Sequence, residues 1–418
     1  MNAVRHVVVM VTSSYPRFPG DGVGSFIEPI AKGVAALGHD VHVVAPWHPA
    51  VMRGTAEDGV CFHFYKYALT RSMNVFGYAQ GLKADTDLRA ATWVAAPAAL
   101  AAGWLKAWRV ASKRGATVMH AHWVVPGGLQ AALAAGRLPL VVSLHGSDVY
   151  VAERHPLIGV GARAVFRRAG WVTACSADLA ARAVALGARR EQTEMLPYGV
   201  DTSRFAPSRE TRRAVRQRLG IGEAPLVFSA GRLVRKKGFE YLLAAARPLR
   251  DAHPDLRVVI AGEGDLRAEL DARASSTPGL VTLLGNQSQD EIARLAAAAD
   301  VIAVPSVHDE AGNVDGLPNF ALEALASGTP VVATRVGGLP DAISDRVTGR
   351  LVPERDAGAL AAAMAELLDD SEGSRRLGAA ARDHVARTFG WARVAERLVV
   401  AYDRAGRRQP LVGANREC

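Results

Sequence analysis

The 418-residue chain exceeds one ordinary hydrophobic core, so we expect two domains of roughly 200 residues each. No apolar run approaches the ~18 residues of a membrane-spanning helix, and the three cysteines lack metal-type spacing, which favours a protein of the reducing cytoplasm. The net charge of +9 is unevenly shared: residues 1–198 carry 20 Lys+Arg against 12 Asp+Glu, and residues 199–418 carry 30 against 29. This asymmetry indicates an acidic partner, such as a membrane surface or a phosphorylated substrate. A nucleic acid is disfavoured, because no recognised binding motif accompanies the charge.

Short apolar runs rich in β-branched residues alternate with helical stretches through the first half of the chain. They lie at 7–13, 41–46, 118–123, 140–146 and 171–176. This alternation predicts a parallel sheet covered on both faces. Within it, Gly22 and Gly24 precede a helical stretch, and glycines there let backbone amides approach a phosphate or sugar. The motif is weak, because GDGVG is not a Walker loop.

The segment GWLKAWRVASKRG places aromatic and basic side chains together at the expected end of a helix. Such a combination suits an anionic lipid interface. Two tryptophans facing the core, with a solvated basic face opposite, would give the same pattern, so both interpretations stay open. The residues concerned are Trp104, Lys106, Trp108, Arg109, Lys113 and Arg114.

Histidines follow two of the predicted strands. His120 and His122 lie in HAHW, and His145 precedes Asp148 in LHGSD. Histidine near a ligand site can bond sugar hydroxyls or phosphate at neutral pH. The ligand set is too loose to predict a metal site, and we expect His120 to form a structural hydrogen bond.

A proline- and glycine-containing passage at 196–208 is the best candidate for an interdomain linker. After it, further strands are predicted at 226–232, 257–264, 281–286, 301–306, 331–334 and 349–353. We therefore predict an α/β protein with two doubly wound domains, 1–198 and 199–390, facing each other across a cleft that holds the ligands. The amphipathic stretch 391–408 is long enough to pack back on the first domain.

Two segments of the second half could hold an anion. Arg232 follows a predicted strand, and Lys237 leads into a helix through Gly238, so a guanidinium and an ammonium could neutralise a diphosphate. Asp315 and Glu323 enclose seven residues around a Gly-Leu-Pro-Asn turn, where a helix begins and its amides are unpaired. A solvated loop and an ordinary turn remain the plain alternatives.

Taken in order, GDGVGSF, GHDVHVVAP, HAHW, LHGSD, LPYGVD, SAGRLVRKKG, AGEGDL and DGLPNFALEALASGTPVVAT resemble the pattern of glycosyltransferase family 4. The similarity runs from about residue 7 to about residue 400. It implies a GT-B fold of two Rossmann-like domains, the first binding the acceptor and the second the donor. It also implies a retaining hexosyltransferase (EC 2.4 class) that uses a UDP- or GDP-linked sugar and needs no metal or other cofactor. The family members that it most resembles act in bacterial exopolysaccharide and cell-envelope synthesis, in the cytoplasm or peripherally at the inner face of the plasma membrane.

The resemblance also assigns roles to residues. His145, Arg232, Lys237 and Asp315 would serve catalysis, and His122 and Asp148 would contact a glycan, glycolipid or polyprenyl-linked acceptor. The donor would be held by Gly22, Gly24, Arg232, Lys237, Gly316, Leu317, Asn319, Phe320 and Glu323.

The pattern departs from the family at Asp315, where the family has glutamate, so the usual contact with donor-sugar hydroxyls is expected through water or not at all. Two other functions stay open. One is a sugar-nucleotide epimerase of similar fold, which would turn over the donor without a second substrate. The other is a non-catalytic protein that binds the sugar nucleotide.

Overall fold

The computed structural model describes residues 5–68, 76–78, 82–83, 87–88 and 90–407. The chain forms two compact units. The first comprises Met1–Pro197 together with Trp391–Cys418, and the second is Tyr198–Gly390. Among the described residues, no helix is both long and apolar enough to cross a membrane.

The first unit is built on an eight-stranded sheet of order β10-β9-β8-β7-β1-β2-β4-β3, and only β3 is antiparallel to its neighbour. Its central strands are almost wholly buried, as expected for a sheet covered on both faces. The strands are β1 (Val7–Val11), β2 (Asp40–Pro46), β3 (Ala56–Glu57), β4 (Val60–Tyr65), β7 (Val118–His122), β8 (Leu140–Leu144), β9 (Trp171–Ala174) and β10 (Thr193–Met195). A separate pair, β5 (Leu82–Lys83) and β6 (Asp87–Leu88), is antiparallel.

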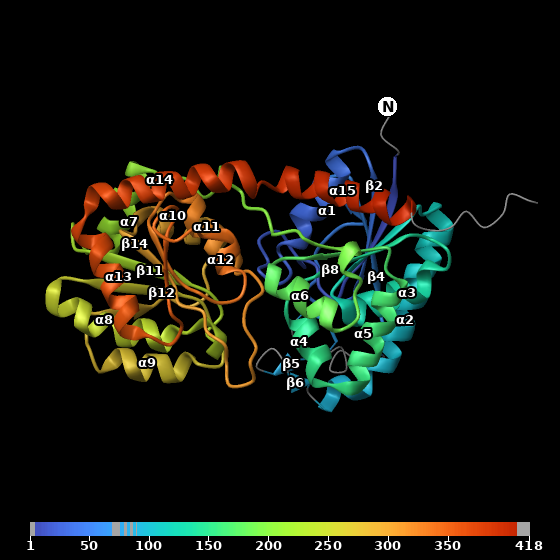
Figure 1. The fold of residues 1–418 in the computed structure, drawn as a ribbon, viewed down its shortest axis with the longest axis horizontal. Coiled ribbons are helices and arrows are strands. Elements are labelled where there is room, and N and C mark those ends of the chain that lie inside the picture. The colour runs from blue at the N-terminus through green and yellow to red at the C-terminus, as the bar shows by residue number, and fades with distance from the viewer. Residues whose placement is uncertain (1–4, 69–75, 79–81, 84–86, 89, 408–418) are drawn as a thin grey trace, which may run out of the picture. The chain divides into compact units, whose positions relative to one another are not determined.

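Helices cover both faces of this sheet (Figure 1). They are α1 (Ile27–Ala36), α2 (Ala90–Arg114), α3 (Leu129–Ala135), α4 (Ser147–Arg154), α5 (Pro156–Arg168), α6 (Ala177–Ala185) and α15 (Trp391–Arg407). The last helix, α15, packs against α1, and the two share a core with β1 and β2. Their approach is close, because a Cβ added at Gly33 would lie 2.9 Å from the Cβ of Ala395. Position 408, the expected end of this helix, lies outside the described residues.

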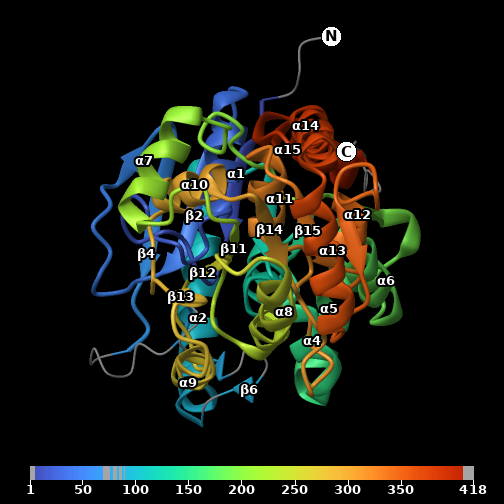
Figure 2. The ribbon, with the colours of Figure 1, turned by 90° about the vertical axis from the view of Figure 1, so that its left-hand side faces the viewer.

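The second unit has a six-stranded parallel sheet of order β13-β12-β11-β14-β15-β16 (Figure 2). Its strands are β11 (Leu226–Ala230), β12 (Arg257–Ala261), β13 (Val281–Leu283), β14 (Val301–Val304), β15 (Val331–Thr334) and β16 (Arg350–Val352). Its helices are α7 (Arg209–Leu219), α8 (Phe239–Ala252), α9 (Arg267–Ser275), α10 (Gln289–Ala298), α11 (Asn319–Ala326), α12 (Leu339–Ala342), α13 (Ala357–Asp369) and α14 (Ser371–Thr388).

In both sheets the order of the strands reverses at one point. The second sheet grows outward from β11 through β12 to β13, and then resumes on the other side with β14. The first sheet reverses in the same way between β1 and β7. At such a switch point the loops from two neighbouring strands diverge at the carboxyl edge, where ligands bind in doubly wound folds. The topology therefore predicts ligand-binding loops after β11 and β14 in the second unit, and after β1 and β7 in the first.

Each of the predicted strands is present, with ends up to three residues shorter than expected. Sequence reasoning missed β4 and β10, and also the two-residue strands β3, β5 and β6. In β4, the sequence VCFHFY mixes Cys61 and His63 into the apolar run, and β10 is a three-residue edge strand with the polar sequence TEM. Neither segment carries the uninterrupted β-branched run on which the predictions rested.

The loop after β11 is fixed by backbone contact with the loop after β14. The N–H of Val307 donates to the carbonyl of Lys236 at 2.9 Å. Gly238 adopts φ +64°, and a Cβ added there would collide with the carbonyl oxygen of Pro305. Only glycine satisfies both the dihedral angle and the contact.

Replacing this glycine tests the contact. Gly238→Ala should lower the free energy of unfolding by about 3 kcal/mol, because dihedral strain and a backbone collision add. Gly279→Ala is a matched control, since Gly279 also has positive φ (+76°) but nothing lies within 4 Å of an added Cβ. It should lose only about 1 kcal/mol. Equal losses in urea denaturation would show that the contact with Pro305 is unimportant.

Candidate functional site

The second unit gathers two lysines and one carboxylate at its switch point. A short 3₁₀ turn, Arg235–Lys237, follows β11, and Asp315 lies between β14 and α11. Lys236 Nζ lies 3.1 Å from Asp315 Oδ1, and Lys237 Nζ lies 2.6 Å from Asp315 Oδ2. All three side chains are mostly buried, with 8%, 17% and 12% exposed for Lys236, Lys237 and Asp315. Lys236 was not among the residues assigned from sequence, because adjacent lysines give no indication that both turn inward.

The charges of this cluster determine the ionisation of Asp315. Burial alone would raise the pKa of its carboxyl group, but the nearby charges of Lys236 and Lys237 outweigh burial and hold the pKa well below its usual range. Asp315 is therefore ionised at neutral pH. Two lysines and one carboxylate leave the cluster with a net charge of one positive unit.

The first turn of α11 adds donors beside these lysines. The helix begins at Asn319 after Pro318, with no side chain capping its first amides. Uncapped amides and the helix dipole favour an anion at this end. The neighbouring Gly316, Leu317 and Phe320 are buried. Four of the donor residues assigned by resemblance, Gly316, Leu317, Asn319 and Phe320, therefore lie on one continuous turn and helix start.

Polar atoms without partners mark the same place. Among the described residues, Ser306 Oγ and Asn319 Oδ1 are buried and have no hydrogen-bond partner. Ser306 lines a small recess together with Lys237, Pro318 and Phe320. Burying an unsatisfied hydroxyl costs stability, so a ligand that supplies a partner would be favoured here. Ser306 ends the run VIAVPS, and its position just after β14 was the only sequence signal for it.

Glu323 lies one turn into α11. Burial raises the pKa of its carboxyl group to about 7, against smaller lowering effects from Arg204, Gln289 and Lys237. A carboxyl group with this pKa changes charge near neutral pH. Arg232, by contrast, is exposed on the loop after β11, at the same edge of the sheet.

In the first unit, the loop after β1 is held by an ion pair that sequence reasoning missed. Arg17 Nε lies 2.6 Å from Asp21 Oδ2, and the N–H of Val23 donates to Asp21 Oδ1 at 3.2 Å. This pairing leaves Gly22 exposed, and no described residue lies within 4 Å of an added Cβ. Gly24 takes φ +68° and lies against Ser14. The loop is ordered by its acid and keeps open space at Gly22.

Two histidines meet after β7 and β8. His122 Nδ1 lies 3.1 Å from His145 Nε2, and the rings are nearly parallel. Burial lowers the pKa of His122 to about 3, and burial together with His122 holds the pKa of His145 well below its usual value. Both rings are therefore neutral, and one donates to the other. Phe26 and Trp123 flank the ring of His145 at centroid distances of 4.6 and 5.0 Å.

Asp148 holds the two loops together. Its carboxylate accepts hydrogen bonds from the N–H groups of Val124 at 2.7 Å, Gly146 at 3.1 Å and His145 at 3.3 Å. Burial raises the pKa of Asp148 to about 6, against the lowering effect of these bonds. Asp148 therefore stabilises the two loops, and its contact with an acceptor stays a prediction.

The expected structural hydrogen bond of His120 is confirmed. Its Nε2 lies 2.8 Å from Ser143 Oγ, and its Nδ1 lies 2.9 Å from the hydroxyl of Tyr402 on α15. The ring is fully buried. His120 thus ties α15 to the sheet of the first unit.

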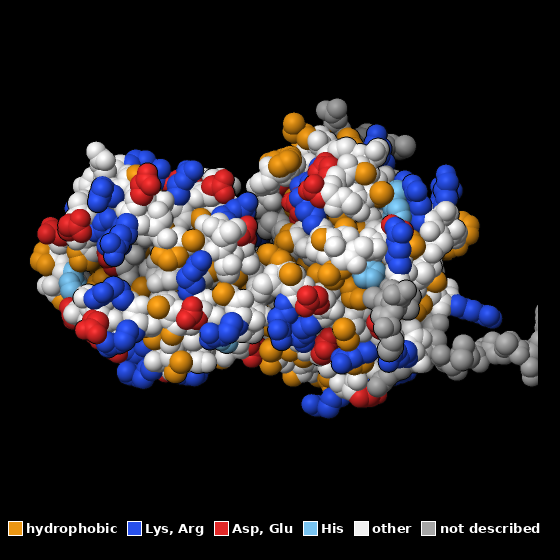
Figure 3. All heavy atoms as spheres, turned by 90° about the horizontal axis from the view of Figure 1, so that it is seen from above, with side chains coloured by type: hydrophobic (Ala, Val, Ile, Leu, Met, Phe, Trp, Pro, Cys, Tyr) orange, Lys and Arg blue, Asp and Glu red, His pale blue; other side chains and the backbone are white. Residues whose placement is uncertain are grey.

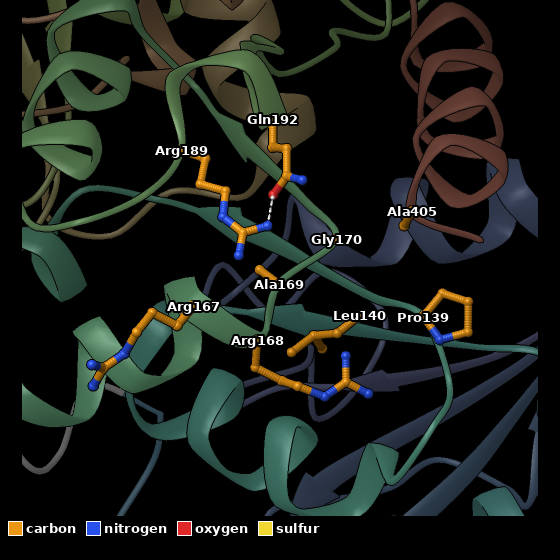
Figure 4. A pocket seen from close by; sticks show the side chains of 9 residues that line it. All are labelled: Pro139, Leu140, Arg167, Arg168, Ala169, Gly170, Arg189, Gln192 and Ala405. Carbon is orange, nitrogen blue, oxygen red and sulfur yellow. Dashed lines mark hydrogen bonds between the residues drawn. The ribbon is translucent and has the colours of Figure 1, made fainter. Parts of the chain in front are cut away.

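A small pocket of about 90 Å³ lies at the opposite, amino-terminal edge of the first sheet (Figure 4). Arg168 is occupied there, because its guanidinium donates to the carbonyls of Gly136 and Leu138, both at 2.7 Å. Arg189 bonds Gln192, and Arg167 points away from the other side chains. The guanidinium of Arg168 therefore stabilises a turn rather than presenting itself to a ligand.

The long helix α2 presents an apolar stripe to solvent. Trp93, Trp104 and Trp108 are 45%, 41% and 50% exposed. The buried side of α2 is made of small residues, and a Cβ added at Gly103 would collide with Gln130 of α3. Close packing on that side forces the large rings outward, so the interpretation as core-facing tryptophans is wrong. Arg109, Lys113 and Arg114 are exposed on the same helix, and Lys106 is partly exposed.

One face of the molecule carries basic and acidic side chains together (Figure 3). On the face seen in Figure 3, Lys and Arg side chains lie among Asp and Glu side chains.

Comparisons with known proteins cover both units of the chain. The family model described as Glycosyltransferase Family 4 matches residues 20–204, and the model described as Glycosyl transferases group 1 matches residues 211–384. A GDP-mannose-dependent alpha-(1-6)-phosphatidylinositol monomannoside mannosyltransferase of Mycolicibacterium smegmatis is 35% identical over 271 residues, which are 63% of this chain and 71% of that protein. A glycogen synthase of Mycobacterium tuberculosis is 30% identical over 96% of both chains.

The chain belongs to glycosyltransferase family 4. It is a hexosyltransferase, and these relatives favour transfer over the epimerase and binding-protein alternatives. Solved structures support the fold: Anabaena Alr3699/HepE in complex with UDP has a TM-score of 0.76 at 20% identity, covering 95% of this chain and 99% of that one. Sucrose-phosphate synthase from Thermosynechococcus elongatus has a TM-score of 0.77 at 21% identity, with 97% and 100% covered. The two Rossmann-like units of this glycosyltransferase are those of a GT-B fold.

The pKa of Glu323 generates a pH prediction. Ribose hydroxyls donate more strongly to an ionised than to a protonated carboxyl group, so binding a nucleoside diphosphate should favour the charged form. Affinity should therefore rise as the pH increases from about 6 to 8 and then level off. Glu323→Gln is the control, because it keeps the titration of the ligand's own phosphate. Equal pH dependence of the dissociation constants of wild type and Glu323→Gln would contradict a ribose contact.

Proposed function

We propose that this family 4 enzyme transfers a hexose, with retention of configuration, from a nucleotide diphosphate sugar to a hydroxyl group. The acceptor is a glycan, a glycolipid or a polyprenyl-linked sugar of envelope or exopolysaccharide synthesis. No metal is needed in this scheme, because lysine side chains and helix amides supply the positive field for the diphosphate. The second unit binds the donor and the first unit binds the acceptor.

One observation carries this proposal: the buried lysine pair beside the uncapped start of α11. Lys237 lies at the switch point, and the orphan hydroxyl of Ser306 lines the same recess. An ammonium group, unpaired amides and an orphan hydroxyl together fit a ligand rich in acceptor oxygens, and a diphosphate is such a ligand. Glu323 on the same helix would accept hydrogen bonds from ribose hydroxyls.

The chemistry follows from stabilising the leaving group. The bond between the anomeric carbon and the diphosphate oxygen breaks, and the diphosphate leaves with the electron pair. The acceptor oxygen attacks the same face, forms the new glycosidic bond and gives its proton to the departing phosphate. Charge develops on the diphosphate oxygens in the transition state, so Lys237, Arg232 and the amides of Gly316, Leu317, Asn319 and Phe320 lower the barrier.

The first unit supplies neutral hydrogen-bonding groups. His145, flanked by Phe26 and Trp123, is suited to a sugar hydroxyl, since the imidazole is neutral and a hydroxyl can either donate or accept a hydrogen bond. Gly22 offers exposed backbone, and Gly24 lies against Ser14 on the same loop. His122 bonds His145, and Asp148 holds the loops, so both belong to the proposed acceptor side.

The donor that we test first is GDP-mannose, because the Mycolicibacterium smegmatis relative is named as GDP-mannose-dependent. A thermal-stabilisation screen of GDP- and UDP-sugars identifies the donor, since a ligand at 100 times its dissociation constant adds about 2.7 kcal/mol. If only a UDP-sugar stabilises the enzyme, the donor is that UDP-sugar and not GDP-mannose. No stabilisation by any sugar nucleotide would contradict the donor site.

Lys237→Ala should lower turnover about 100-fold, because it removes a cation from the developing charge of the leaving group. Arg235→Ala is the matched control: it removes a cation from the same turn, but Arg235 is exposed and pairs with Glu269. Its turnover should stay within about twofold of wild type. Steady-state transfer assays with both variants check this, and near-wild-type activity of Lys237→Ala would reject the assignment.

We also propose that α2 docks on an anionic membrane surface, where a lipid-linked acceptor resides. The exposed rings of Trp104 and Trp108 would enter the interface, and Lys106, Arg109, Lys113 and Arg114 would attract anionic headgroups. Aromatic and basic groups on one exposed helix are the pattern that such a surface binds.

Flotation with lipid vesicles tests the docking surface. The enzyme should float with vesicles containing phosphatidylglycerol and not with purely zwitterionic vesicles, because the basic residues need anionic lipid. The double variant Trp104→Ala/Trp108→Ala should lose flotation. Val400→Ala, which removes an apolar side chain 46% exposed on α15, should keep it. If the wild-type enzyme does not float with the anionic vesicles, α2 does not dock on an anionic membrane.

A further inference from the structure

The carboxylate of Asp315 forms ion pairs with Lys236 and with Lys237, the lysine that would bind the diphosphate of the proposed donor. The ion pair between Lys237 Nζ and Asp315 Oδ2 spans only 2.6 Å, and Lys236 Nζ holds the other oxygen at 3.1 Å. In the family pattern a glutamate here contacts the hydroxyls of the donor sugar, and for the shorter Asp315 that contact was expected through water or not at all. In this chain the shorter side chain is directed at the lysines.

Several features keep Asp315 in that position. Its carbonyl oxygen lies against Gly337, where an added Cβ would collide with it, so the backbone of residue 315 is tightly packed. Lys236 is 6% exposed, and its carbonyl accepts from Val307, which fixes the turn that carries both lysines. The lysines hold the pKa of the Asp315 carboxyl group well below its usual range, so the carboxylate stays charged under all ordinary assay conditions.

We propose that Asp315 is an internal counter-ion that competes with the diphosphate for Lys237 and thereby weakens the binding of nucleoside diphosphates. This rests on the proposed function, which places the diphosphate at Lys237. When a diphosphate arrives, Lys237 must share its N–H groups between the ligand and Asp315, while Lys236 keeps the carboxylate charged and in place. When the sugar has been transferred, the carboxylate is beside Lys237 and favours release of the product.

The sign of the effect separates this role from the alternatives. A counter-ion repels the diphosphate and occupies its cation, so removing its charge tightens nucleoside diphosphate binding. A residue that contacts only the donor sugar has no effect on a ligand that lacks the sugar. A residue that merely orients Lys237 for the ligand would weaken binding when removed.

The experiment is calorimetric titration of the full-length enzyme with GDP, UDP and ADP. For the nucleotide that binds wild type, Asp315→Asn should tighten the dissociation constant about tenfold or more, because a buried negative charge is removed from the anion site. Asp383→Asn is the matched control: it removes one carboxylate from the exposed surface of α14 and should leave the dissociation constant unchanged. Unchanged or weaker binding by Asp315→Asn would overturn the proposal.

A second pair of variants covers the case in which Asp315→Asn does not fold. Lys236→Gln should weaken nucleoside diphosphate binding, because Asp315 then has Lys237 as its only lysine. The double variant Lys236→Gln/Asp315→Asn restores the charge balance and should bind more tightly than Lys236→Gln alone. Binding no tighter than that of Lys236→Gln would overturn the proposal. Failure of all three nucleotides to bind the wild-type enzyme would instead overturn the proposed function and this proposal with it.

Discussion

The site in the second unit depends on one buried ionic cluster, in which Asp315 is shared by Lys236 and Lys237 at the point where the strand order reverses. Burying an ammonium group without a partner is costly, so two inward lysines require an acid between them in the absence of ligand. The acid comes from the loop after β14 and the lysines from the turn after β11. Charge balance therefore joins the two loops that the topology brings together, and it leaves one positive unit for an anionic ligand.

Close backbone contact is what brings these loops near enough for the cluster to form. Gly238 lies against the carbonyl of Pro305, and Gly262 and Gly264 lie against the backbone of the loop after β11. Packing against this loop therefore accounts for the two glycines of AGEG. In the first unit, side chains order the loops instead. Asp148 and Asp21 accept hydrogen bonds from backbone N–H groups of the loops after β7 and β1. Each unit fixes polar loops on a rigid parallel sheet, which is how a site keeps its geometry before the ligand arrives.

Sequence patterns predicted the sheets well because the central strands are buried on both faces and are rich in valine. The strands β4 and β10 of the first sheet were harder to predict, since they mix polar residues into short runs. For the candidate site, the family resemblance selected loops that the structure brings together in the second unit, but it could not give side-chain directions. Nothing in the letters RKKG shows that both lysines turn toward Asp315, and nothing in VIAVPS shows that Ser306 lacks a partner. The orientation of Trp104 and Trp108 depended on the small residues of the buried side of α2, because Gly103 has no room for a Cβ beside Gln130.

In the function that we propose, the turn after β11 and the start of α11 together hold the diphosphate of the donor. Hydrogen–deuterium exchange of the enzyme with and without the nucleoside diphosphate that it binds tests this most directly. We expect slower exchange in peptides covering residues 231–239 and 315–323, because their amides and lysines would contact the ligand. Protection confined to other segments, with these two unchanged, would contradict the account.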